Sequence, residues 1–279
     1  MAGTLYLCAT PIGNLGDITV RVIEILKSVD IIAAEDTRNT LKLLNHFEIK
    51  TPMTSYHQHN MDTKGPVLIE KLKDGKNIAL VTDAGMPGIS DPGEDMAKRC
   101  RQEGIPVTIA PGASAGISAL VLSGMDARRY VFEGFLPTDK KERQTVLKNL
   151  EKETRTTVFY EAPHRLTDTL GVLLKAAGDR EASTVREITK RYEEVKHGTL
   201  GSLLEYYKKN PPKGEFVVIV GGMSESVLRQ EEIDGWNSIS VEEHMKKYTD
   251  EGMSEKEAMK KVAKDRGVSK REIYAYLNR

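Results

Sequence analysis

Four loops of this sequence carry residues suited to ligand binding, and each follows a short apolar run. The most unusual loop covers 82–93, where three Gly and two Pro fall within twelve residues. A loop that only connects two elements rarely needs so many residues with special backbone conformations, so this composition predicts a ligand site. The loops 10–17 and 110–116 bring small residues to the start of predicted helices, whose first amides are free to bind a ligand oxygen. Tight turns and close packing of a helix against a sheet are the alternative interpretations of these two loops.

Polar side chains that can transfer a proton or hold an anion follow other predicted strands. The fourth loop, 161–165, combines a carboxylate with two basic groups, and the segments 35–38 and 55–60 are similarly polar. General acid–base catalysis needs a group of this kind within reach of the reacting atom. An N-cap carboxylate and ion pairing are the structural alternatives. The candidates for a base are Glu161, Asp36 and His57, and those for gripping a phosphate or holding an acid in place are Arg38 and Arg165.

The sequence predicts no metal site and lacks the common nucleotide fingerprints. His57 and His59 form a His-x-His pair, but no third ligand has a telltale spacing, so a substrate contact is the favoured role for His57. Neither a GxGxxG segment nor a Walker P-loop occurs in the chain. The standard dinucleotide and nucleoside triphosphate signatures are therefore missing.

The composition is that of an ordinary globular protein. The chain has 279 residues, and its 41 Lys and Arg balance 41 Asp and Glu, so no long-range field attracts nucleic acid or a membrane. No apolar run approaches the roughly 18 residues of a spanning helix, and no basic residue precedes Arg21, so we expect neither a membrane segment nor a signal peptide. Cys8 and Cys100 are isolated and no glycosylation sequon occurs, which favours a cytoplasmic protein.

Short apolar runs alternate with helix-period segments, which is the βαβ rhythm of an α/β protein. The composition turns highly charged after Leu136, so a domain boundary is expected there. Closely spaced strands in the second half predict a mixed sheet, and three Ser-x-x-Glu capping boxes near the C-terminus predict short helices whose last pair resembles a helix-turn-helix. We expect two α/β domains, 1–136 with a mainly parallel sheet and 137–223 with a mixed sheet, then a linker at 224–239 and a helical appendix at 240–279.

Five distinctive segments occur in order along the chain: TPIGNL at 10–15, AEDTR at 34–38, DAGMPGISDPG at 83–93, PGASA at 111–115 and FYEAPHRL at 159–166. Together they resemble the tetrapyrrole methylase superfamily, specifically its ribosomal RNA small subunit methyltransferase I branch, over about residues 1–222. The resemblance implies S-adenosylmethionine as methyl donor, bound in a donor-binding cleft between the two α/β domains, and a homodimer. It also implies 2′-O-methylation of a cytidine in the decoding region of 16S ribosomal RNA. The superfamily's Gly-Asp-Pro loop stands here as Gly85-Met86-Pro87, which argues against a tetrapyrrole substrate.

The resemblance also implies which residues contact the donor. A neutral adenosine with a folded amino-acid tail requires backbone amides and apolar walls, and small or apolar residues dominate the implied set. The set consists of Pro11, Ala84, Gly85, Met86, Ile89, Ser114, Ala115 and Ala162, with Glu215 and Phe216 added from the last strand of the second domain.

Contacts to RNA are expected from two short basic segments. Lys190 and Arg191 lie in a run whose ordinary interpretation is a solvated surface, and Lys270, Arg271 and Arg279 lie in the appendix, whose structural interpretation is a small stabilising bundle. Zero net charge favours an assembled small ribosomal subunit over naked RNA as substrate. A tetrapyrrole C-methyltransferase, or a non-catalytic sensor that binds S-adenosylmethionine and RNA, is the alternative function.

Overall fold

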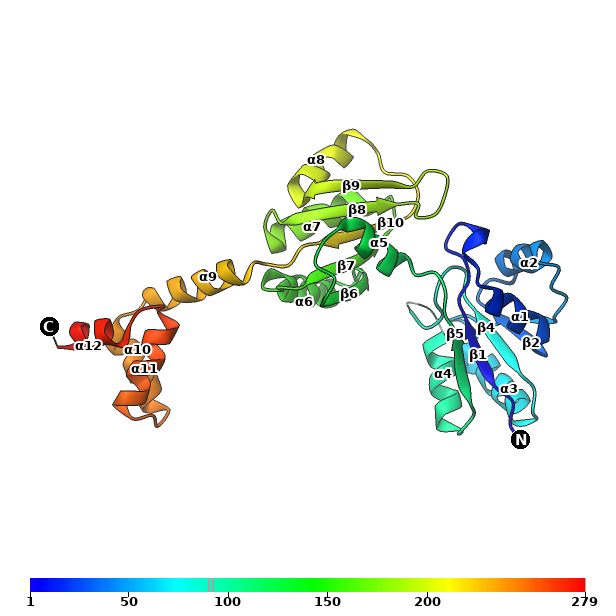
Figure 1. Ribbon diagram of the computed structural model, residues 1–279, viewed down its shortest axis with the longest axis horizontal. Coiled ribbons are helices and arrows are strands. Elements are labelled where there is room, and N and C mark those ends of the chain that lie inside the picture. Colours follow the sequence, from blue (N-terminus) through cyan, green and yellow to red (C-terminus); the bar gives the residue numbers. More distant parts are fainter. Residues whose placement is uncertain (90, 92, 279) are drawn as a thin grey trace.

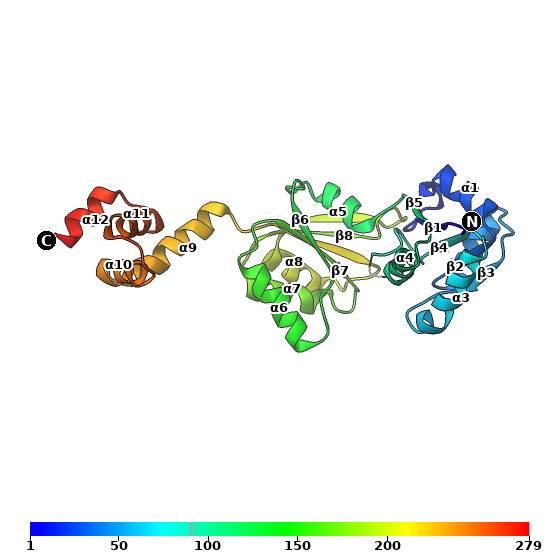
Figure 2. The same ribbon diagram turned by 90° about the horizontal axis from the view of Figure 1, so that it is seen from below.

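The computed structural model describes residues 1–89, 91 and 93–278, which form two sheets followed by a helical tail (Figures 1 and 2). The first sheet is wholly parallel, in the order β3-β2-β4-β1-β5. Its strands are β1 (Leu5–Cys8), β2 (Ile31–Ala34), β3 (Met53–Ser55), β4 (Ile78–Val81) and β5 (Val107–Ala110). The helical elements around it are η1 (Leu15–Asp17), α1 (Val20–Ser28), α2 (Thr37–His46), α3 (Met61–Lys73) and α4 (Gly93–Gln102).

Helices cover both faces of the first sheet, which explains why its strands are apolar without alternation. Successive side chains of a strand point to opposite faces. In β4, Ile78 and Leu80 pack against α3 and α4, whereas Ala79 and Val81 pack against α1 and α2. Because all five strands run in the same direction, their carboxyl ends meet at one edge, and the polar loops after β1, β2 and β4 gather there.

The second sheet is mixed, as the sequence predicts, in the order β6-β7-β10-β8-β9. Strands β6 and β7 are parallel, and the other neighbours are antiparallel. Its strands are β6 (Tyr130–Phe135), β7 (Thr156–Glu161), β8 (Glu181–Arg186), β9 (Glu194–Thr199) and β10 (Phe216–Val220). Its helices are α5 (Ala115–Ser123), α6 (Lys140–Glu151), α7 (Leu166–Ala177) and α8 (Leu200–Lys209).

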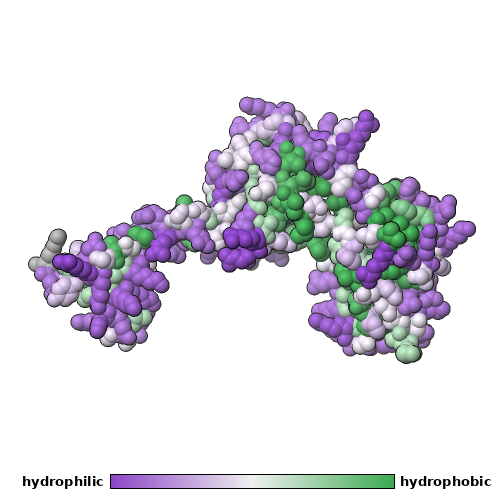
Figure 3. Space-filling model, in the orientation of Figure 1, coloured by the Kyte–Doolittle hydropathy of each residue, from purple (hydrophilic) through white to green (hydrophobic). Residues whose placement is uncertain are grey.

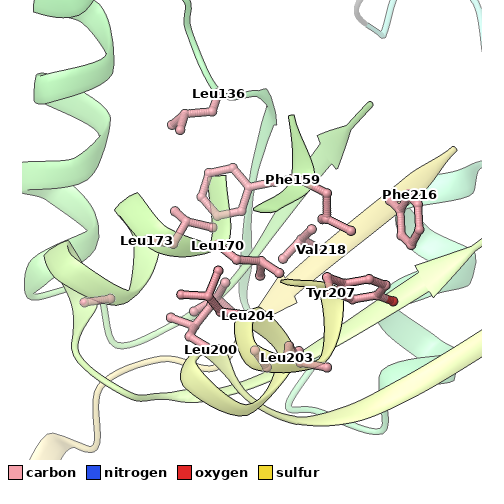
Figure 4. Packing of buried hydrophobic residues seen from close by; sticks show 14 of the residues in the cluster. Leu136, Phe159, Leu170, Leu173, Leu200, Leu203, Leu204, Tyr207, Phe216 and Val218 are labelled. Atoms are coloured by element: carbon pink, nitrogen blue, oxygen red, sulfur yellow. The ribbon is translucent and has the colours of Figure 1, made fainter. Parts of the chain in front are cut away.

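The central strand β10 is buried on both faces. Phe216 and Val218 join Phe159 and Leu170 in the core beneath α7 and α8 (Figure 4), while Val217 and Ile219 face α5 on the other side. The core on the α7 side fixes the position of β7 and β10. These two strands carry Glu161 and Phe216 to the edge that faces the first domain.

The division between the domains differs from the predicted boundary at Leu136. Helix α5 packs on β10, β8 and β7, and β6 pairs with β7, so both belong to the second sheet. The first sheet ends at Ala110, and the second unit therefore begins with α5. The charged residues that follow Leu136 belong to the start of α6, which is an exposed and polar helix, and they do not mark a domain boundary.

Most of the segment predicted as a linker is the helix α9 (Glu225–Asn237). This helix is largely exposed, and Trp236 near its end stacks on His244 of the appendix. The three capping boxes are confirmed, since Ser240, Ser254 and Ser269 cap the last helices. These are α10 (Val241–Asp250), α11 (Glu255–Asp265) and α12 (Lys270–Leu277). In the part of the chain that the structure describes, no helix is long and apolar enough to cross a membrane.

Candidate active site

A cavity of about 390 Å³ lies where the two domains meet, at the carboxyl edge of the first sheet. This size is within the range of sites for small molecules and cofactors. Both domains contribute to its wall, and most of the lining residues come from the loops that the sequence singles out. They are Ile12, Glu35, Thr82, Asp83, Ala84, Gly85, Met86, Ile89, Asp91, Ser114, Ala115, Phe135, Tyr160, Glu161, Ala162, Pro163, Val185, Ile188, Glu215, Phe216 and Val217.

Two loops of the first domain are fastened together beside the cavity. Thr10 and Gly85 exchange backbone hydrogen bonds, 2.9 Å from the amide of Thr10 and 3.1 Å from the amide of Gly85. Gly85 has a φ of +83°, and a Cβ atom there would lie 3.3 Å from the Cγ2 atom of Ile12. Only glycine adopts this conformation without strain and leaves the close approach open. The fastening therefore fixes the backbone of 84–86 in the cavity wall.

Two polar side chains of this wall lack the hydrogen bond that their position would provide. Thr82 is buried and lines the cavity, yet its hydroxyl has no hydrogen-bond partner among the described residues. Ser114 is the N-cap of α5 but its side chain makes no capping bond. Such groups cost free energy unless a ligand or water satisfies them. Helix α5 is held in register by the amide of Gly116, which donates to the hydroxyl of Tyr160 at 3.2 Å.

The charge of the wall has one sign. Five carboxylates line the cavity, those of Glu35, Asp83, Asp91, Glu161 and Glu215, whereas no Lys or Arg does so in the described part of the chain. A nucleoside triphosphate would be repelled by such a wall. A ligand with a positive centre is attracted, and S-adenosylmethionine carries a sulfonium. The apolar side chains and free amides of the same wall suit the neutral adenosine.

Glu161, a predicted base, is fully engaged by its own domain. Its side chain is entirely buried, Oε1 accepts from the amide of Ala162 at 2.8 Å, and Oε2 accepts from the hydroxyl of Thr169 at 2.6 Å. Arg165 adds an ion pair at 3.5 Å and donates to the carbonyl of Leu136 at 2.6 Å. Arg165 and Glu161 are thus paired, and both oxygens of Glu161 accept hydrogen bonds from the chain around Ala162 and from α7.

Asp36 and Arg38 lie outside the cavity wall and pair with each other. Asp36 is the N-cap of α2, and the guanidinium of Arg38 lies 2.7 Å from its Oδ2. The hydrogen bonds from Arg38 lower the pKa of Asp36 to about 2, so this carboxylate is a weak proton acceptor. Arg38 itself is largely exposed. The capping interpretation of Asp36 therefore fits the structure better than the role of a base.

His57 also lies behind the wall rather than in it. Its Nε2 faces the side-chain amide of Asn60 at 3.2 Å, and its Nδ1 is buried without a partner among the described residues. A positive charge on the His57 imidazole would lower the pKa of the Glu35 carboxyl. The sequence indicates only that one acid of Glu35-Asp36 is an N-cap, since the two adjacent acids cannot be told apart before the strand end is placed.

Nine of the ten predicted donor contacts line the cavity, all except Pro11. Pro11 lies between Thr10, which pairs with Gly85, and Ile12, which enters the wall. Thr82 and Asp83 lie in the loop that the sequence predicts as a ligand site, although neither has a predicted role, and Tyr160 is not a predicted site residue. Their position could have identified all three residues, because each lies at the carboxyl end of a buried strand, where ligands of α/β proteins bind.

The predicted RNA contacts differ in whether their charge is already paired within the protein. Lys190 is held 2.7 Å from Glu215 and 3.0 Å from Glu187, so its ammonium is already neutralised and is a poor phosphate ligand. Arg191 is exposed and lies over the ring of Tyr192. Lys270 and Arg271 are exposed in the first turn of α12. Arg279 and two residues of the 83–93 segment, Ser90 and Pro92, lie outside the described residues.

Comparisons with known proteins point to one family. The family model described as "Tetrapyrrole (Corrin/Porphyrin) Methylases" matches residues 4–204. A protein of Halalkalibacterium halodurans named ribosomal RNA small subunit methyltransferase I is 50% identical over 98% of this chain and 93% of its own. Its namesake in Bacillus subtilis is 47% identical over the same shares.

The fold is shared more widely. The crystal structure of uroporphyrin-III-C-methyltransferase from Thermus thermophilus is 19% identical and superposes with a TM-score of 0.56, over 78% of this chain and 94% of that one. This likeness concerns the fold alone. The near full-length identity to curated relatives is more specific: the chain belongs to the tetrapyrrole methylase family and, within it, to the ribosomal RNA small subunit methyltransferase I group.

Proposed function

We propose that this protein transfers a methyl group from S-adenosylmethionine to the ribose 2′-oxygen of a cytidine in the decoding region of 16S ribosomal RNA, acting in the cytoplasm. The relatives' name supports ribosomal RNA as acceptor. The observation that carries the donor assignment is the cavity between the domains, with five carboxylates, apolar walls and no lining cation among the described residues.

S-adenosylmethionine, when bound, supplies a methyl group activated by an adjacent positive sulfur. The chain itself has to bind, orient and exclude water, since much of the acceleration of such a displacement comes from alignment. Backbone groups of 84–86 and the start of α5 are the proposed contacts, and Thr82 supplies a free hydroxyl. Phe216 and Val217 supply the apolar floor from β10.

The acceptor is proposed to be the assembled small ribosomal subunit. The balanced charge of the chain gives weak attraction for naked RNA, and the acidic wall repels a phosphate backbone. If the protein recognises the folded shape of the subunit, it does not depend on a long-range attraction for RNA. Only one nucleotide then has to reach the cavity, so the acidic wall does not meet a long phosphate backbone. Lys270 and Arg271 are proposed to meet phosphate from the appendix, so replacing both with Gln should raise KM for the subunit and leave donor affinity unchanged.

A homodimer is proposed from an unusual exposed surface. Helix α5 is apolar on all sides, and its side chains Ile117 and Val121 are 44% and 69% exposed. Phe132 and Phe135 on the edge strand β6 are exposed beside it, and apolar atoms gather over this region in Figure 3. A second copy would cover this surface, which is larger than scattered apolar residues explain. Val121→Glu is expected to give a monomer in light scattering, and an unchanged mass would exclude this surface.

The test of the function is methyl transfer to defined acceptors. The protein is incubated with labelled S-adenosylmethionine and small subunits from cells that lack the matching methylation, and naked 16S RNA and uroporphyrinogen III serve as parallel acceptors. Label in the RNA of the subunit, on one cytidine after nuclease digestion, is expected. Label only in the porphyrinogen would favour the tetrapyrrole alternative, and donor binding without transfer to any acceptor would favour a sensor.

A further inference from the structure

We propose that Glu35 is the base that accepts the proton of the attacking ribose hydroxyl, an inference that rests on the proposed function. Glu35 follows β2 directly and lines the cavity. Its backbone amide is bound to the carbonyl of Val81 at 3.3 Å, and its Oε2 accepts from the amide of Asp83 at 3.2 Å. Its other oxygen, Oε1, has no hydrogen-bond partner among the described residues, so it is the oxygen that we assign to the ribose hydroxyl of the RNA.

Two other carboxylates of the wall are occupied by the protein. Asp91 accepts from the amides of Gly88 and Gly93 at 2.8 Å and from that of Ile89 at 3.1 Å, which fixes the turn before α4. Both oxygens of Glu161 are engaged by Ala162 and Thr169, as described above. Neither group can take up a proton without losing bonds that hold its loop.

The remaining two carboxylates are poorly suited for different reasons. Asp83 accepts from the amide of Asp36 at 3.2 Å and faces the amide of Asn39 at 3.5 Å, so it fastens α2 to the β4 loop. Glu215 is 81% exposed and lies 2.7 Å from the ammonium of Lys190, which stabilises its charged form. Glu35 is thus the lining carboxylate with a free oxygen and no cationic partner among the described residues.

The surroundings of Glu35 also favour a proton on it. Burial raises its pKa above the ordinary value, and the nearby carboxylates of Asp83 and Asp91 add to this, while the Asp83 amide and His57 oppose it. The titratable groups that face it are thus two acids of the β4 loop and one imidazole of the loop after β3. A carboxylate with a raised pKa is a stronger base near neutral pH than an ordinary one.

The step balances as follows. The O–H bond of the ribose 2′-hydroxyl breaks and its proton moves to Oε1 of Glu35. The 2′-oxygen forms a bond to the methyl carbon, the carbon–sulfur bond breaks, and its electron pair stays on sulfur, which becomes a neutral thioether. The protonated Glu35 then returns its proton to solvent.

The experiment compares Glu35→Gln with wild type and with Glu24→Gln, a matched change of an exposed carboxylate on α1. Single-turnover rates on small subunits are measured from pH 5 to 8, donor affinity by calorimetry, and the titration of Glu carboxyls by carbon NMR in the free protein. For Glu35→Gln we expect at least a ~100-fold lower rate, a much smaller loss of donor affinity from the removal of one of the five lining carboxylates, and a melting temperature close to wild type. Glu24→Gln should match wild type throughout.

The pH dependence separates a base from a structural role. The wild-type rate should rise with pH through one ionisation above 4.5, and a carboxyl resonance titrating at the same pH should vanish in Glu35→Gln. A near-normal rate for Glu35→Gln, or the same pH-dependent rise in that variant, would overturn the proposal. If wild type itself labels no RNA, the proposed function fails instead, and the NMR titration still reports whether Glu35 has a raised pKa.

Discussion

Gly13 of the first domain lies so close to Lys190 of the second that a Cβ atom on Gly13 would come within 2.4 Å of the Cγ atom of Lys190. The ammonium of Lys190 is bound to Glu187 and Glu215, so the side chain cannot swing away freely. Glu187 and Thr189 have positive φ values of 49° and 65°. Strained backbone of this kind persists where the surroundings hold it. The contact therefore joins the loop after β1 to the β8–β9 loop next to the cavity.

Gly13→Ala should loosen this contact and weaken donor binding about tenfold, which corresponds to ~1.4 kcal/mol. The reason is that the added methyl group must displace a side chain held by two carboxylates. Calorimetry with S-adenosylmethionine measures the effect. Gly171→Ala is the matched control, because Gly171 lies inside α7 with open space around it. That change should leave donor affinity unaltered, and equal affinities for both variants would contradict the account.

Glu161→Gln should act on stability and donor affinity rather than on the proton transfer. Gln keeps only one of the two acceptor oxygens of Glu161, so it can accept the hydrogen bond from Ala162 or the one from Thr169 but not both. One unsatisfied buried group costs roughly 1–3 kcal/mol. Chemical denaturation should detect this loss, and Thr169→Val should reproduce a part of it. A Glu161→Gln protein of wild-type stability whose only defect is a slow chemical step would show that Glu161 is a base after all.

The acidic wall predicts a preference among donor analogues. Sinefungin carries an ammonium group where S-adenosylhomocysteine has a neutral sulfur, so it should bind several-fold more tightly to a cavity lined by five carboxylates. The difference should shrink as salt is added, although less than for exposed charges. Competition against labelled S-adenosylmethionine gives both affinities. Equal affinities at low salt would mean that the lining carboxylates do not face the reacting centre.

Much of the fold was predictable, because periodic apolar runs mark buried elements. The runs that became β1, β2 and β4 were identified as strands, and so was the mixed second sheet. Helix α3 was missed since Gly65 and Pro66 stand inside it. Strand β6 was missed because it is an edge strand with exposed Phe132 and Phe135, which gives it no buried run. Because β6 was not predicted as part of the second sheet, the predicted domain boundary lies too far along the chain.

The loops that form the site were predictable from the sequence, but the roles of their residues were not. Loop composition located the cavity, since small residues and glycines are needed wherever backbone approaches a ligand. Which acid is free depends on hydrogen bonds between residues far apart in sequence, such as that from the amide of Asp83 to Glu35. Sequence spacing carries no information on these contacts. Of the three predicted bases, Glu161 and Asp36 have protein partners and His57 does not line the cavity, so the proposal of Glu35 depends on the geometry.

The helical appendix should lose stability as the solution is acidified. His244 is buried and stacked on Trp236 at 3.9 Å, and its Nδ1 accepts a hydrogen bond from Arg266 at 3.2 Å. Burial lowers its pKa, and the positive charge of Arg266 lowers it further. As pH falls through about 6.5, the unfolded chain binds a proton that the folded appendix refuses, so the free energy of unfolding decreases.

The fluorescence of Trp236, the single tryptophan of the chain, monitors this unfolding directly. The melting midpoint should be lower at pH 5.5 than at pH 7.5. His244→Gln keeps an acceptor for Arg266 but cannot titrate, so its midpoint should depend less on pH. Identical pH dependence in both proteins would exclude His244 as the responsible group.

The most direct test of the central claim is to locate the transferred methyl group within the nucleotide. A methyl on the 2′-oxygen removes the nucleophile that cleaves the neighbouring phosphodiester in alkali. Labelled RNA from the small-subunit reaction is therefore hydrolysed in alkali and compared with a nuclease digest. The account predicts that the label is recovered in one alkali-resistant dinucleotide that begins with cytidine. Label in an alkali-sensitive mononucleotide would place the methyl group on a base and contradict ribose methylation.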